Sequence, residues 1–114
     1  MKINEIGRMA HHINANNGWD VMRPEMWSVE NQPPFTRDDL RFLCTHMALV
    51  HSEVSEATEA IRKHDRDNFD EELADVVIRV ASIAHGLGTD LESVIRAKLA
   101  KNATRGLHHG GKAV

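Results

Sequence analysis

The sequence is poor in residues that define several common classes of protein. Its 114 residues include one cysteine, three prolines, no tyrosine and only 4% aromatic residues. A single cysteine, Cys44, excludes a disulfide framework and a CxxC metal site, and its apolar neighbours predict a buried structural thiol. No apolar run approaches the ~20 residues of a membrane helix, and the first residues lack the apolar core of a signal peptide. We therefore expect a cytoplasmic protein with no membrane partner.

Charges of one sign are missing from the end of the chain. The formal net charge is −3, which gives no support for general nucleic-acid binding. No acidic residue follows Glu92, whereas five basic residues do: Arg96, Lys98, Lys101, Arg105 and Lys112. The acidic middle and the basic end could form two halves of one polyphosphate site, or could simply pair with each other.

Apolar residues recur at spacings of three and four, and no segment alternates with a period of two. The pattern predicts helices over about residues 2–16, 36–63, 68–86 and 89–105, with caps at Thr36, Asn68 and Thr89. The short connection after the second helix predicts antiparallel neighbours. The expected fold is therefore all-α and four-helix bundle-like, with residues 1–106 as one domain and 107–114 as a flexible tail.

The second predicted helix is apolar over more than one face. The first stripe consists of Leu40, Leu43, Met47, Val50, Val54, Ala57 and Ile61. The row beside it consists of Phe42, His46, Leu49, Glu53, Glu56 and Ala60. Helices with such wide apolar coverage pack against several partners, and we expect one of them to be a second subunit.

Two acidic pairs, Glu53 with Glu56 and Glu72 with Asp75, each place two carboxylates on one helix face. If the two helices are antiparallel neighbours, four carboxylates could meet and repel by about 1–4 kcal/mol per close pair. They then either point at water or hold a cation, and their apolar neighbours favour the cation. Oxygen-only ligands suit Mg²⁺. A di-iron bundle would require Glu-x-x-His pairs, which the chain lacks.

Three blocks of sequence together resemble a known superfamily. They are Glu53-x-x-Glu56-x-x-Glu59, Glu72-x-x-Asp75 and Lys98-x-x-x-Asn102-x-x-Arg105. They are similar to the MazG-like all-α nucleoside triphosphate pyrophosphohydrolases, a superfamily that includes the all-α dUTP and dCTP hydrolases and phosphoribosyl-ATP pyrophosphohydrolase. The resemblance covers about residues 36–106. It implies hydrolysis of a (deoxy)nucleoside triphosphate to the monophosphate and pyrophosphate, in a homodimer or a dimer of dimers.

The resemblance also implies roles for individual residues. The acids that would hold Mg²⁺, or Mn²⁺ in its place, are Glu53, Glu56, Glu72 and Asp75. One glutamate of the second helix, Glu53 or Glu56, would also orient the attacking water, because neighbouring anions raise the pKa of a carboxylate. The residues expected to contact phosphate are Lys98, Asn102, Arg105, Arg79 and Lys112. The basic block could instead compensate the C-terminus of its helix, Arg79 could be a counter-charge for the acids, and Lys112 could lie in a disordered tail.

The base-binding residues are the least determined part of the site. We consider Trp19 and Trp27 as stacking groups, with Asn16 and His12 nearby to read the base edge. The tryptophans could equally be core anchors. Two other functions stay open: hydrolysis of phosphoribosyl-ATP, and a non-catalytic helical dimerisation module whose acids are merely solvated. The tryptophan-bearing segment favours a plain nucleotide as substrate.

Overall fold

The computed structural model describes residues 1–27 and 36–104, and residues 28–35 and 105–114 lie outside the described part. The described residues form four α-helices and one short 3-10 helix, with no strand: α1 Ile3–Asn16, η1 Pro24–Met26, α2 Arg37–Arg62, α3 Arg66–Gly86 and α4 Leu91–Thr104. The predicted all-α fold is confirmed. Arg105, Lys112 and the predicted tail lie outside the described residues. No helix in the described ranges combines the length and apolar character needed to cross a membrane.

Local hydrogen bonds determine where α2 and α3 begin. Thr36 caps α2 as predicted, since its Oγ1 accepts from the backbone N–H of Asp39 at 3.0 Å. The prediction for α3 is wrong by three residues. Asp65 is the cap, and its Oδ1 accepts from the backbone N–H of Asn68 at 3.1 Å. Asn68 is therefore the recipient of the cap and lies within the first turn.

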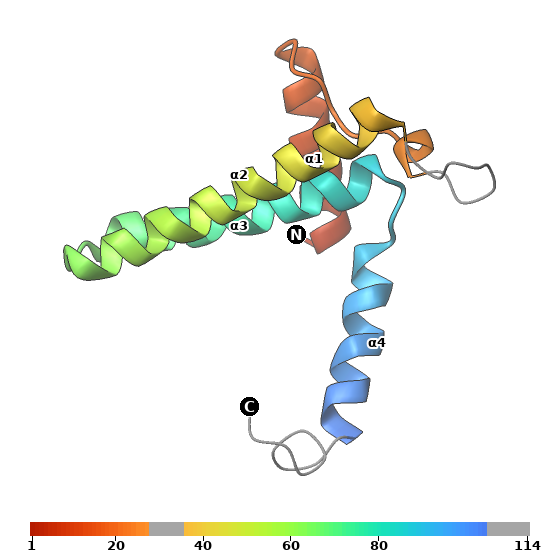
Figure 1. Ribbon diagram of the computed structural model, residues 1–114. Coiled ribbons are helices and arrows are strands. Elements are labelled where there is room, and N and C mark those ends of the chain that lie inside the picture. Colours follow the sequence, from red (N-terminus) through yellow and green to blue (C-terminus); the bar gives the residue numbers. More distant parts are fainter. Residues whose placement is uncertain (28–35, 105–114) are drawn as a thin grey trace.

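The helices α2 and α3 run antiparallel as a long hairpin, and α1 crosses α3 (Figure 1). The crossing is close because Gly7 lies directly against the backbone carbonyl of Ala81, where a Cβ atom would have no room. Gly86, at the end of α3, approaches the backbone of Met22 in the same manner. Two glycines thus let α1 and the segment that follows it lie on α3.

The core is small and is built around two methionines from the segment after α1. Met22 and Met26 are buried with Leu43, and three partly buried residues pack against them: Phe42, Ile83 and Leu87. Both tryptophans are instead exposed, Trp19 by 72% and Trp27 by 53%. The alternative that the tryptophans anchor the core is therefore wrong.

Much of the predicted apolar stripe of α2 is not covered within the chain. Leu43 and Ala57 are buried, but four members of the stripe are 48–58% exposed: Leu40, Met47, Val54 and Ile61. Cys44, beside them, is also exposed, so the predicted buried thiol is wrong. In α3, Leu73 and Val77 are also nearly half exposed. Both helices of the hairpin therefore carry large apolar side chains that are only partly covered within the chain.

The last helix, α4, extends away from the other three (Figure 1) and has no buried residue. Its N-terminus is fixed by Asp90, whose carboxylate accepts from the backbone N–H and the hydroxyl of Ser93. Asn4 of α1 donates to Asp90 at 2.8 Å and accepts from the backbone N–H of Glu92 at 3.0 Å. The predicted capping box that starts at Thr89 is therefore wrong, because Asp90 and Asn4 satisfy these groups.

Candidate functional site

Three carboxylates from the α2–α3 hairpin meet at one point. Glu53 and Glu56 come from α2 and Glu72 comes from α3, and each offers an oxygen within 4.8 Å of the other two. The i, i+3 spacing on α2 and the antiparallel course of α3 produce this meeting. The structure thus brings together three of the four predicted acids. Asp75 is exposed on α3 and is not a member of this group.

We call these three carboxylates the acidic cluster, and the pKa values of two of them are shifted in opposite directions. The Nε of Arg79 donates to the Oε1 of Glu53 at 2.9 Å. This hydrogen bond holds the pKa of Glu53 below its usual value. In Glu72, the hydrogen bond with Glu53, then burial, and then the nearby Glu56 raise the pKa to about 7. The raised pKa thus lies on Glu72 of α3, and the lowered pKa lies on Glu53 of α2.

The acidic cluster has the donor set and the polarity of a site for a hard divalent cation. The Oε2 of Glu72 is buried and has no hydrogen-bond partner among the described residues, which is unfavourable for a charged oxygen. Carboxylate oxygens are the ligands that Mg²⁺ and Mn²⁺ prefer. A cation among Glu53, Glu56 and Glu72 would satisfy this oxygen and offset the mutual repulsion. The residues present therefore fit such an ion.

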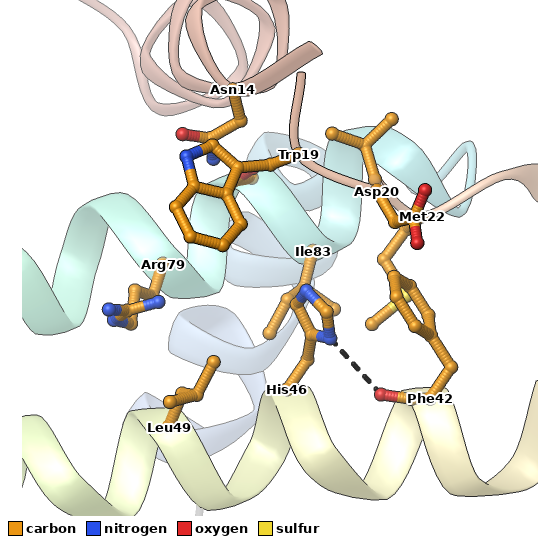
Figure 2. Close-up of a pocket in the computed structure, with 11 residues that line it drawn as sticks. Asn14, Trp19, Asp20, Met22, Phe42, His46, Leu49, Arg79 and Ile83 are labelled. Carbon is orange, nitrogen blue, oxygen red and sulfur yellow. Dashed lines mark hydrogen bonds between the residues drawn. The ribbon is translucent and has the colours of Figure 1, made fainter. Parts of the chain in front are cut away.

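An open cleft of about 610 Å³ lies beside the acidic cluster, between α2, α3 and the segment that follows α1 (Figure 2). Its α2 wall consists of Phe42, His46 and Leu49. Its α3 wall consists of Arg79, Ser82 and Ile83. The remaining wall consists of Asn14 and residues 19–22. The cleft is thus mainly apolar, with a few polar groups at its margins, as is usual for a small-molecule site.

Arg79 connects the cleft with the acidic cluster. Its side chain lines the cleft while its Nε is hydrogen-bonded to Glu53. Glu53 is largely buried, with 14% of its side chain exposed, whereas 40% of Arg79 is exposed. The guanidinium therefore stands at the junction between an apolar cleft and a group of acids.

A family model for the MazG nucleotide pyrophosphohydrolase domain matches residues 43–109. The chain belongs to this MazG family. No curated protein and no solved structure matched. The match begins within α2 and includes all four predicted acids and the basic block of α4. It leaves out α1 and the segment with Trp19, so one wall of the cleft lies outside the matched residues.

Of the four residues predicted to bind the base of a nucleotide, one lines the cleft of this MazG domain. Trp19 lines the cleft, and Figure 2 shows its indole above the space beside His46. Trp27 does not line the cleft, and Asn16 is hydrogen-bonded to His12 on an exposed face of α1. Asn14 and His46 also line the cleft, and neither was predicted as a site residue. A signal for His46 was present, since it belongs to the same helical row as Glu53.

The basic block of the MazG domain lies apart from the acidic cluster. Lys98 and Asn102 are exposed on α4, which extends away from the hairpin that carries the acids (Figure 1). Within one chain, the structure does not bring these two residues to the carboxylates. Arg105, the third member of the block, lies outside the described residues.

Proposed function

We propose that this MazG domain hydrolyses a (deoxy)nucleoside triphosphate to the nucleoside monophosphate and pyrophosphate, with Mg²⁺ as cofactor. The observation that carries the proposal is the position of Arg79, which lines the cleft and is paired with Glu53 of the acidic cluster. A ligand that is apolar and planar at one end and polyanionic at the other matches this arrangement. A nucleotide has both ends.

Glu53, Glu56 and Glu72 would hold the ion, and Asp75 of the acidic motif is a candidate fourth ligand. When bound, Mg²⁺ or Mn²⁺ neutralises phosphate charge and lowers the pKa of water. Arg79 contacts the phosphate nearest the nucleoside, since it stands where the cleft meets the acids. Its guanidinium offers phosphate a bidentate contact. Trp19 stacks on the base.

In the reaction, the oxygen of a water molecule attacks the α-phosphorus. The bond between the α-phosphorus and the oxygen that bridges to the β-phosphorus breaks, and pyrophosphate leaves with that oxygen. A carboxylate of α2 takes the proton of the water. Of the two candidates, we favour Glu56, because it is exposed, whereas Glu53 is largely buried and bonded to Arg79.

We further propose that the chain works as a homodimer or a dimer of dimers through α2. The support is the half-exposed apolar stripe of α2, which includes Met47 and Val54. Light scattering at micromolar concentration should give a multiple of the 12.8 kDa chain mass. Val54→Asp should reduce that multiple, because a charge in an apolar interface is unfavourable. A monomeric mass for the unaltered protein would refute the proposal.

The decisive experiment measures pyrophosphate release with Mg²⁺ across the ribo- and deoxynucleoside triphosphates, with phosphoribosyl-ATP as one more substrate. Glu53→Gln and Glu72→Gln should each lower kcat/KM by at least about 100-fold. Glu71→Gln is the matched control, since Glu71 is the exposed neighbour of Glu72 outside the cluster. Equal, metal-independent release by all four proteins would contradict the enzyme and favour a helical dimerisation module.

A further inference from the structure

His46 is a polar residue on the otherwise apolar α2 wall of the cleft, between Phe42 and Leu49. Its Nδ1 lies 3.1 Å from the backbone carbonyl oxygen of Phe42, one helical turn earlier. The rings of His46 and Phe42 are also in contact, with centroids 4.2 Å apart. The imidazole is therefore held in one orientation by both a hydrogen bond and a ring contact.

The hydrogen bond to Phe42 determines which ring nitrogen carries the proton. A carbonyl oxygen can only accept, so Nδ1 must donate. In the neutral imidazole, Nε2 then has no proton and is an acceptor. No hydrogen-bond partner for Nε2 occurs among the described residues. Figure 2 shows this second nitrogen turned away from the Phe42 carbonyl, toward the space beneath Trp19.

We infer that His46 is a specificity-determining residue, whose Nε2 accepts a hydrogen bond from an N–H group on the edge of a nucleobase in the cleft. The inference rests on the proposed function only in placing a nucleoside there. The indole of Trp19 covers the base, and His46 reads its edge from the α2 wall. A ligand with an acceptor atom at the same point would bind more weakly, because its lone pair would face the lone pair of Nε2.

Such an acceptor separates amino bases from keto bases. Cytosine and adenine carry an amino donor and an unprotonated ring nitrogen where uracil and hypoxanthine carry a carbonyl acceptor and a ring N–H. A fixed acceptor therefore favours one member of each pair. It favours the amino base if Nε2 meets the exocyclic group, and the keto base if it meets the ring nitrogen. In either arrangement, His46 makes the cleft selective within each pair.

The test is a binding experiment that requires no hydrolysis. The chain has two tryptophans, and of these Trp19 lines the cleft. Trp27→Phe therefore leaves Trp19 as the fluorescent probe. In this background, with EDTA present, quenching is followed during titration with cytidine, uridine, adenosine and inosine monophosphates. We expect Kd values to differ by about 10-fold within each amino–keto pair. The preferred base gains one hydrogen bond to Nε2, and the other base lacks it.

Three further variants test the role of His46 itself. His46→Phe keeps an aromatic ring but has no acceptor, so the preference should fall below about 2-fold through weaker binding of the preferred base. His46→Gln should bind both base types, because a carboxamide can present either its oxygen or its NH₂ group. His51→Phe, an exposed α2 histidine outside the cleft, should keep the original preference. Thermal unfolding of each variant verifies that it is folded.

The outcomes separate this inference from the proposed function. Absence of quenching by every nucleotide, equal Kd values within both pairs, or an unchanged preference in His46→Phe would each overturn the inference. Loss of the preference in His51→Phe as well would also overturn it. If pyrophosphate release is absent but binding is selective and depends on His46, the proposed hydrolysis is wrong and the inference stands.

Discussion

The body of the molecule, formed by α1, η1, α2 and α3, differs from α4 in how it is held. The body has a core around Met22, Met26 and Leu43. In contrast, none of the 14 residues of α4 is buried, and Val94 and Leu99 are exposed by 54% and 62%. A free helix of this length is marginal in water. The difference indicates that the body is stabilised by its own contacts, whereas α4 is attached mainly at its N-terminus.

The same division runs through the candidate site. The acidic cluster and the cleft belong entirely to the body, whereas the basic block of the MazG motif, with Lys98 and Asn102, belongs to α4. The part that is well packed thus carries the acidic cluster and the cleft. The part that is weakly packed carries Lys98 and Asn102, for which phosphate contacts are predicted. The following experiments would break or sharpen this comparison.

The largest effect is expected where α1 crosses α3. Gly7→Val places a branched side chain against the carbonyl of Ala81, and should lower the free energy of unfolding by about 3 kcal/mol or more. Urea denaturation measures the loss. Glu5→Ala, at an exposed position of the same helix, is the control. An unchanged midpoint for Gly7→Val would show that the crossing does not hold the body together.

A smaller effect is expected where α4 is attached. Asn4→Ala removes the hydrogen bonds to Asp90 and to the backbone of Glu92, and should destabilise α4 by about 1–2 kcal/mol. Hydrogen exchange should therefore become faster in α4 and stay unchanged in α2 and α3. Asn16→Ala, which removes an exposed hydrogen bond to His12, is the control. Equal acceleration throughout the chain would contradict the separation into body and α4.

A comparable but somewhat smaller effect is expected from the helix caps. Thr36→Ala should lower the free energy of unfolding by about 1 kcal/mol, because the N–H of Asp39 loses its acceptor. Thr89→Ala should change it by less than about 0.5 kcal/mol, because Asp90 caps α4. Thermal unfolding of both variants measures the contrast. If Thr89→Ala lowered the free energy of unfolding more than Thr36→Ala does, the capping box at Thr89 that the sequence predicts would be supported after all.

A further effect is a pH dependence within the body. Glu72 binds its proton more tightly when folded, with a pKa of about 7 against the ordinary 4.5. Its stabilisation is therefore complete below pH 4.5 and is lost as the pH rises through 7. Glu53, whose pKa is lowered, stays ionised in this window. Between pH 5.5 and 8, with EDTA, Tm should fall more steeply for the wild type than for Glu72→Gln. Parallel curves would refute the assignment.

The sequence predicted the features that depend on residues close together in the chain, namely the helices and one helix cap. The 3.6-residue period identified all four helices, and Thr36 has the cap geometry expected from its neighbours. The prediction from sequence failed where residues distant in the chain interact. Asn4, 86 positions before Asp90, is hydrogen-bonded to Asp90 at the start of α4. The methionine core was also missed, because Met22 and Met26 lie in a segment without helical periodicity.

The candidate site was predicted to a similar degree. The meeting of Glu53, Glu56 and Glu72 follows from i, i+3 spacing and an antiparallel hairpin, which sequence can supply. Spacing did not predict that Asp75, three residues after Glu72, lies outside this group of three. The role that we propose for His46 rests on its hydrogen bond to the Phe42 backbone and on the position of Trp19, and both require the folded chain.

The raised pKa of Glu72 has a consequence that calorimetry can measure. With a pKa of about 7, this carboxyl is about half protonated at neutral pH. A divalent ion that enters the acidic cluster must displace that proton into the buffer, roughly half an equivalent for each ion bound. The heat of titration with Mg²⁺ or Mn²⁺ should therefore vary linearly with the ionisation enthalpy of the buffer. The slope counts the protons released, and Glu72→Gln should reduce it to nearly zero.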